Sequence, residues 1–334
     1  MILHRETPPA GTVRDWLNAR AATDSVAFQF PVTKQSLTWA ELRDHAARIA
    51  AHLTAQGIAK GESVACINPN SLEGVLSLYG ILYGGFRATM INLVAGAEAI
   101  GYALDHSEAR HAFVHPDAME LFKQVSNKGQ ISPVDLNGDT SAPLHSLTAD
   151  DDALLMYTSG TTGRCKGVML SHANLCANAA GSVKSYRMPE RQTFLTSAPI
   201  FHLAAGGRVY ALAAANNHAV VMQRFEPVEA QRLIQTHRIN DAMLVPSMMN
   251  MIFNAPDFGA FDLSSLRRIT YGAAPMSAGL LARVMQVLTN VDFYQGYGAS
   301  ETGPLISVLP PEAHDLDGPF AGKLASVGLP AVHC

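Results

Sequence analysis

The stretch YTSGTTGRCKGV, residues 157–168, carries the strongest signal in the sequence. It follows an apolar run that is expected to be a strand, 153–157, and it precedes a helical pattern. Two glycines, Gly160 and Gly163, allow the backbone to turn tightly and to expose its N–H groups. Further donors are the hydroxyls and the ammonium of Thr158, Ser159, Thr161, Thr162 and Lys166. Such a set of donors on a loop predicts a site for a polyphosphate.

Two better-known loop types do not fit this stretch. Cys165 stands where a Walker loop has glycine before its lysine. Ser159 lacks the glycine two residues earlier that a nucleophile elbow requires. Composition alone also fits an ordinary surface loop rich in Ser, Thr and Gly, so the loop needs support from the rest of the chain.

On both sides of the loop, helical and strand patterns alternate. Thr38 and Glu41 form a capping-box signature before a helix that is expected to end near Gly57. Further helices are expected at 71–83, 97–105, 228–238 and 277–288. Strands are expected at 63–67, 88–93, 111–115, 153–157, 219–223, 241–245, 266–271 and 291–294. This alternation predicts an α/β fold with largely parallel sheets.

A turn-rich stretch, DLNGDTSAP at 135–143, marks a boundary between two expected α/β lobes. The first lobe would cover 1–145 and the second 146–334. The chain has 334 residues, of which 48% are hydrophobic and 16% charged, so large buried cores are expected and intrinsic disorder is excluded.

The charge and the cysteines exclude several classes of function. A net charge of −4 provides no basic surface for nucleic acid. Four scattered cysteines do not form a disulfide framework or a zinc motif. The longest apolar run, 74–85, is too short to span a membrane, and residues 1–10 do not resemble a signal peptide. A cytoplasmic protein without an integral membrane segment is therefore expected.

The whole of 157–168 resembles the phosphate-binding signature of the adenylate-forming superfamily. This superfamily comprises acyl-CoA synthetases, aryl-CoA ligases, peptide-synthetase adenylation domains and luciferases. One departure is Cys165, where the family usually has proline. Three further motifs agree in order and spacing with the family: PIFH at 199–202, YGAAP at 271–275 and QGYGASET at 295–302.

The resemblance implies roles for individual residues. Tyr297 would stack on adenine, Ser300 would contact the α-phosphate, and Glu301 would bind Mg²⁺, a hard ion that prefers carboxylate and phosphate oxygens. Lys166, Ser300, Glu301 and His202 are the expected catalytic residues. The rest of the nucleotide site would consist of the 158–163 loop with Gly272, Ala273, Ala274, Pro275 and Gly298. Taken singly, His202 also fits a core histidine, and Glu301 a solvated loop carboxylate.

The motif PIFH is expected to lead into the acyl pocket. A histidine there is typical of acyl- and aryl-CoA ligases, whereas amino-acid-activating domains tend to have aspartate. The pocket candidates are small or apolar, and they include no charged partner for a second carboxylate or an amine: His202, Ala204, Ala205, Gly206, Gly207, Val245, Met248, Met249 and Met251. A medium- or longer-chain fatty acid is therefore the expected substrate, with an aromatic acid as the alternative. The methionines also fit ordinary core packing.

The implied activity is that of a ligase that uses ATP, Mg²⁺ and coenzyme A. A carboxylate would attack the α-phosphate, release pyrophosphate and form an acyl-adenylate, from which a thiol displaces AMP. A non-catalytic nucleotide or acyl binder is the alternative from another class. By resemblance the chain is expected to lack the ribose-binding aspartate and the small C-terminal domain, and so to be catalytically incomplete. The sequence leaves open whether the thiol acceptor is coenzyme A or a carrier protein. It also leaves open whether the protein forms a homodimer.

Overall fold

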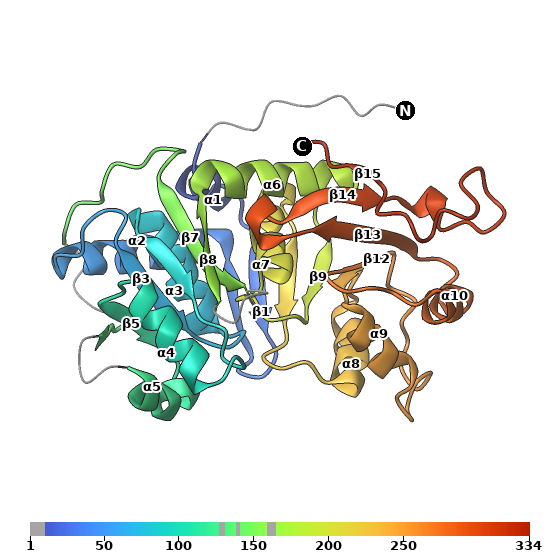
Figure 1. Cartoon of the computed structure of the whole chain (residues 1–334), viewed down its shortest axis with the longest axis horizontal. Helices are drawn as coiled ribbons and strands as arrows, with labels where there is room; N and C mark the ends of the chain where they lie inside the picture. Colours follow the sequence, from blue (N-terminus) through green and yellow to red (C-terminus); the bar gives the residue numbers. More distant parts are fainter. Residues whose placement is uncertain (1–10, 127–130, 138–140, 159–164) are drawn as a thin grey trace.

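The computed structural model describes residues 11–126, 131–137, 141–158 and 165–334. Figure 1 shows the arrangement of its helices and strands. The helices are α1 (Val13–Ala21), α2 (Trp39–Ala55), α3 (Leu72–Gly84), α4 (Ala97–His106), α5 (Met119–Val125), α6 (His172–Ser185), α7 (Leu203–Ala215), α8 (Pro227–His237), α9 (Pro246–Phe253) and α10 (Ala278–Val287), with short 3₁₀ turns η1 (Pro116–Ala118), η2 (Ser300–Thr302) and η3 (Pro311–Ala313). The strands are β1 (Val26–Phe30), β2 (Gln35–Thr38), β3 (Ser63–Ile67), β4 (Arg87–Met90), β5 (His111–Val114), β6 (Ser132–Pro133), β7 (Asp152–Thr158), β8 (Lys166–Ser171), β9 (Thr193–Thr196), β10 (His218–Val221), β11 (Asp241–Met243), β12 (Arg268–Gly272), β13 (Asp292–Gly298), β14 (Leu305–Leu309) and β15 (Leu329–Pro330).

The strands form two mixed, largely parallel sheets. One has the order β15-β14-β13-β12-β11-β9-β10-β1-β2, and the other has the order β6-β5-β3-β4-β7-β8. The antiparallel pairs lie towards the edges: β1–β2, β13–β14, β14–β15 and β7–β8. The predicted α/β class with largely parallel sheets is confirmed.

Local sequence signals account for the predicted elements, whose ends are shifted by a few residues. At the start of α2, the Thr38 amide donates to the Glu41 carboxylate at 2.8 Å. The Glu41 amide donates back to the Thr38 hydroxyl at 3.1 Å, which completes the predicted capping box. The longest apolar run becomes α3, which is buried along nearly its whole length between other elements.

The 157–168 stretch was expected to precede a helix, and α6 (His172–Ser185) follows it, but only after an additional strand. The chain first returns as β8, antiparallel to β7, with Thr158 opposite Lys166. Val168 and Leu170 lie further inside than Gly167 and Met169, an alternation typical of an edge strand. Helix α6 begins only after β8. Lys166 is thus the exposed first residue of a strand, and the loop residues 159–164 lie outside the described part.

The sheets do not divide the chain at the expected lobe boundary, 145/146. Strands β1 and β2 come from the first part of the chain but join the nine-stranded sheet, beside β10. Strands β7 and β8 come from the second part but join the six-stranded sheet, beside β4. The two expected lobes therefore exchange strands.

A layer of helices lies between the two sheets and contains much of the largest core. This core combines side chains of α2, α3, α6 and α7 with side chains from strands of both sheets. Its aromatic contacts join Phe28 to Trp39 and to Tyr79, and Tyr79 to Tyr210, at centroid distances of 6.0–6.4 Å. Helix α7, in yellow-green near the centre of Figure 1, is buried within this layer.

No helix in the described residues has both the length and the apolar composition needed to cross a membrane.

The parallel strands β9, β11, β12 and β13 determine where a site can form. Their carboxyl ends meet at one edge of the nine-stranded sheet, which is where open α/β sheets usually bind ligands. Each of three predicted motifs follows or ends one of these strands: 199–202 after β9, 271–275 at the end of β12 and 295–302 at the end of β13.

Candidate active site

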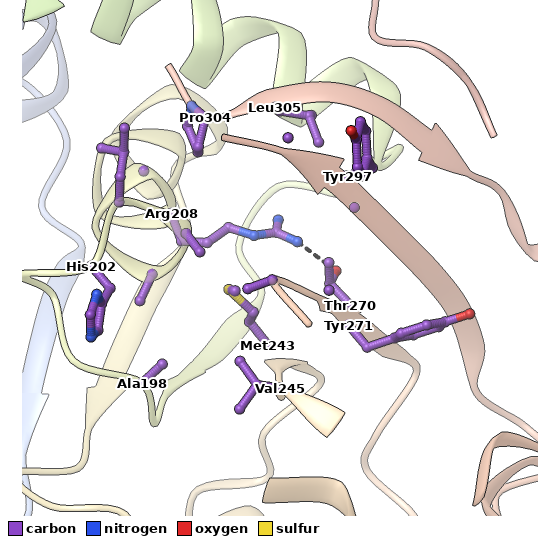
Figure 2. Close-up of a pocket in the computed structure, with 18 of the residues that line it drawn as sticks. Ala198, His202, Arg208, Met243, Val245, Thr270, Tyr271, Tyr297, Pro304 and Leu305 are labelled. Atoms are coloured by element: carbon purple, nitrogen blue, oxygen red, sulfur yellow. Dashed lines mark hydrogen bonds between the residues drawn. The ribbon is translucent and has the colours of Figure 1, made fainter. Parts of the chain in front are cut away.

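A cavity of about 540 Å³ opens at this edge of the sheet (Figure 2). It lies among α6, α7, α9 and the carboxyl ends of β12 and β13. Residues from three predicted motifs and from the predicted acyl pocket line it together: His202, Ala204, Ala205, Gly207, Val245, Met248, Gly272, Ala273, Ala274, Tyr297, Gly298 and Ser300.

One wall is formed by backbone at the end of β12. Gly272 pairs with Gly296 of β13, and a Cβ at Gly272 would lie 2.2 Å from the Gly296 carbonyl oxygen. Ala273 has a φ of 62°, a conformation that is uncommon for a residue with a side chain. The result is a smooth surface of small residues, beside the half-exposed ring of Tyr297. A flat aromatic base would fit against such a surface.

The predicted phosphate ligands lie on neighbouring elements. Ser300 lines the cavity at the start of η2, and Glu301 is the next residue, exposed on the same turn. Turn η2 lies against β8, whose first residue is Lys166. Thr158 is half-buried at the end of β7 and lines a separate cavity together with Tyr157 and Cys165. The loop candidates Ser159, Gly160, Thr161, Thr162 and Gly163 lie outside the described residues.

No cluster of three or more His, Cys, Asp or Glu side chains that could bind a metal ion occurs in the described part of the chain. Glu301 contributes one carboxylate at this edge, on η2. One carboxylate together with nucleotide phosphates is a usual environment for Mg²⁺, so the donor set fits this ion.

His202 lines the cavity as the N-cap residue of α7. Its carbonyl oxygen accepts hydrogen bonds from the amides of Ala205 and Gly206, at 3.0 and 2.8 Å. Its ring packs beside Phe201. Desolvation lowers the pKa of the His202 imidazole below its usual value, which favours the neutral ring.

Several predicted residues do not line the cavity. Met249 is fully buried in the core beside β11 and β12, and Met251 is exposed on the other side of α9. Gly206 faces the Ile200 carbonyl, since a Cβ there would lie 2.6 Å from that oxygen. Pro275 is exposed beyond the turn.

The cavity also contains polar residues that the sequence prediction missed. Arg208 of α7 is 4% exposed and lines the cavity, together with Asn178, Ser182, Tyr186 and Thr270. The sequence prediction named no charged side chain for the pocket, whereas this cavity contains the guanidinium of Arg208. The available signal was an arginine six residues after His202, in a helix that is otherwise apolar, LAAGGRVYALAAA.

Arg208 crosses the cavity from α7 to β12 (Figure 2). It donates to the Thr270 hydroxyl at 2.5 Å and to the Met188 sulfur at 3.1 Å. Its guanidinium carbon lies 4.1 Å from the centre of the Tyr186 ring. These contacts hold the guanidinium in a defined position inside the cavity.

The chain is similar to a known family and to several known proteins. A family model described as AMP-binding enzyme matches residues 16–334. A feruloyl-CoA synthase from an Amycolatopsis species is 32% identical over 301 residues, which cover 89% of this chain and 60% of that protein. The long-chain-fatty-acid–CoA ligase FadD13 of Mycobacterium tuberculosis is 28% identical, over 86% of this chain and 60% of that protein.

A solved structure has the same fold. The inhibitor-bound N-terminal domain of FACL13 from Mycobacterium tuberculosis superimposes with a TM-score of 0.84 at 27% identity. The match covers 90% of this chain and 79% of that one. The chain spans about 60% of the length of the curated relatives above.

Proposed function

Since this chain belongs to the AMP-binding enzyme family, we propose that the protein it represents uses ATP to activate a carboxylic acid. The product would be an acyl-adenylate, which is then converted to a thioester of coenzyme A. The observation that carries this proposal is the convergence on one cavity of His202, Tyr297, Ser300 and the 272–274 backbone. The chain spans only part of its relatives, so the activity is proposed for the whole protein.

Different residues of the site would bind different parts of the substrates. The 272–274 backbone and Tyr297 would hold adenine, while Ser300 and Lys166 would donate hydrogen bonds to phosphate oxygens. Glu301 would hold Mg²⁺, which when bound would neutralise phosphate charge and make the α-phosphorus easier to attack. His202 would orient the substrate carboxylate towards the α-phosphate. Its lowered pKa keeps the ring neutral near pH 7, so it can donate from one nitrogen and accept at the other.

The residues of the cavity wall bear on which class of carboxylic acid the protein would activate. Ala204, Ala205, Gly207, Val245 and Met248 supply an apolar wall that suits a fatty acid or an aromatic acid. The relatives include proteins named for each class, a feruloyl-CoA synthase and a long-chain-fatty-acid–CoA ligase. The position of Arg208 favours a compact acid over a long unbranched chain, because its side chain extends from α7 across to Thr270 of β12.

The experiment is to measure pyrophosphate release by the full-length protein with ATP, Mg²⁺ and a panel of carboxylic acids. Release that requires both ATP and one class of acid, followed by AMP release on addition of coenzyme A, would support the proposal. Met251→Ala, on the exposed side of α9, serves as a control that should match the wild type. Nucleotide binding without pyrophosphate release for any acid would instead support a non-catalytic binding module.

A further inference from the structure

Arg208 is a buried cation in a wall that otherwise consists of neutral groups. It is 4% exposed, and its two hydrogen-bond acceptors are the Thr270 hydroxyl and the Met188 sulfur. Neither acceptor is charged. In the part of the chain that the structure describes, no carboxylate lies within ion-pair distance of Arg208. A buried charge is costly unless it is paired, so an anion that enters the cavity would be stabilised there.

The nearby buried carboxylate is already engaged. Asp241 of β11 is 1% exposed and pairs with Arg268 of the neighbouring strand at 3.5 Å. Arg208 also acts electrostatically on Asp241, but no direct contact joins the two. Asp241 thus balances the charge of Arg268. Among the described residues, Arg208, which lines the cavity, has no carboxylate of its own to pair with.

Other groups of the same wall could help to bind an anion. Asn178 and Ser182 of α6 line the cavity beside Arg208. The Asn178 amide nitrogen lies 3.2 Å from a ring nitrogen of His333, and the Ser182 hydroxyl donates to the Asn178 oxygen at 3.4 Å. Amide and hydroxyl groups accept and donate readily, so they could turn towards a bound carboxylate. A guanidinium with such neighbours suits the planar carboxylate group, which it can bind through two parallel hydrogen bonds.

We propose that Arg208 selects acids that carry a second, anionic carboxylate at the end remote from the activated one. The substrate class is then a compact dicarboxylic acid. This inference rests on the proposed function, because it places the activated carboxylate beside His202.

The geometry limits the size of the acid. Arg208 follows His202 by six residues on α7, which corresponds to about 9 Å along the helix axis. The Arg208 side chain then spans from α7 to Thr270 of β12, to which it donates a hydrogen bond (Figure 2). A short aliphatic diacid or a carboxyl-substituted aromatic acid fits between these limits. A long alkyl chain would have to displace the guanidinium and leave it buried against hydrocarbon.

The test measures binding of stable acyl-adenylate analogues to the 334-residue chain by titration calorimetry. The probes are 5′-O-(N-acylsulfamoyl)adenosines in two matched pairs, glutaryl with pentanoyl and 4-carboxybenzoyl with 4-methylbenzoyl. Within each pair, a terminal carboxylate replaces a terminal methyl group on the same acyl skeleton. A charge-assisted contact predicts that at least one carboxylated member binds about tenfold to a hundredfold more tightly than its partner.

Variants assign the preference to the guanidinium. Arg208→Met should abolish the preference, and Arg208→Lys should retain part of it. Arg232→Met, which removes an exposed arginine of α8, should leave the preference unchanged and so exclude an effect of net charge. Thermal unfolding of each variant checks that it folds.

The outcomes separate the two proposals. Equal binding within both pairs of the wild-type chain, or tighter binding of the methyl members, would overturn the role of Arg208 and leave the proposed function standing. This result needs no variant, so it holds even if Arg208→Met does not fold. Failure of all four analogues to bind would count against the proposed function itself, and the inference would be lost with it.

Discussion

Acid should destabilise this protein in part through a fully buried histidine, His172. It is the first residue of α6 and is fully buried. Its Nδ1 accepts a hydrogen bond from the Val13 amide at 3.3 Å, so the neutral ring carries its proton on Nε2. Burial lowers the pKa of His172 from 6.5 to about 4; Asp151 and Asp15 oppose this shift, while Arg14 and Lys60 add to it.

The sign and size of the effect follow from these values. The folded chain binds this proton less readily than the unfolded chain does, so the contribution to stability is fully present above pH 6.5 and is lost as the pH falls towards 4. A difference between 6.5 and about 4 corresponds to a total of about 3 kcal/mol, of which about 2 kcal/mol is lost between pH 7 and pH 5. Protonation of Nδ1 would also abolish its role as acceptor for the Val13 amide.

The measurement is urea unfolding at a series of pH values, followed by the fluorescence of Trp16 and Trp39, the only two tryptophans. The comparison is with His172→Asn, whose amide oxygen can replace Nδ1 as an acceptor but does not titrate. The wild type should lose about 2 kcal/mol more than the variant between pH 7 and pH 5. Profiles that run parallel within about 0.5 kcal/mol would refute the reasoning, because the titration of the other histidines is common to both proteins.

Two further predictions concern the nucleotide end of the cavity. Glu301→Gln in the full-length protein should lower the rate of adenylation about a hundredfold, equivalent to about 3 kcal/mol, without lowering the unfolding temperature, because the side chain is exposed. A rate within twofold of the wild type at limiting magnesium would argue against a role in metal binding. Gly272→Ala should destabilise the chain by about 1–3 kcal/mol and weaken ATP binding, because its Cβ would lie 2.2 Å from the Gly296 oxygen. Gly279→Ala, where nothing lies within 4 Å of the new Cβ, is the control for urea unfolding and ATP titration; equal effects of the two substitutions would contradict the steric argument.

The amino-acid sequence was sufficient for features that depend on local pattern. The capping box at Thr38 and Glu41 and the alternation of helices and strands require only residues that lie a few positions apart. The order of the motifs was sufficient to identify the family. Because the strands are parallel, their carboxyl ends had to meet at one edge, and that edge places His202, Gly272 and Tyr297 together.

The tertiary structure alone decided which side chains of the buried helices face the cavity. Helix α7 is buried on nearly all sides, so it has no polar face from which its orientation could be predicted. Packing between the sheets turns Gly207 and Arg208 towards the cavity and Gly206 towards Ile200. The same applies to α9, where Met248 lines the cavity and Met249 fills the core.

The exchange of strands between the two sheets also could not be predicted from local sequence patterns. β1 pairs with β10, and these strands are separated by nearly two hundred residues, so their pairing depends on how the whole chain packs. In the candidate site, the position of Arg208 could not be predicted from local sequence either. Its charge is visible in the sequence, but a long side chain can reach either water or a buried pocket. Contacts with Thr270, Met188 and Tyr186, which other segments contribute, keep its guanidinium inside.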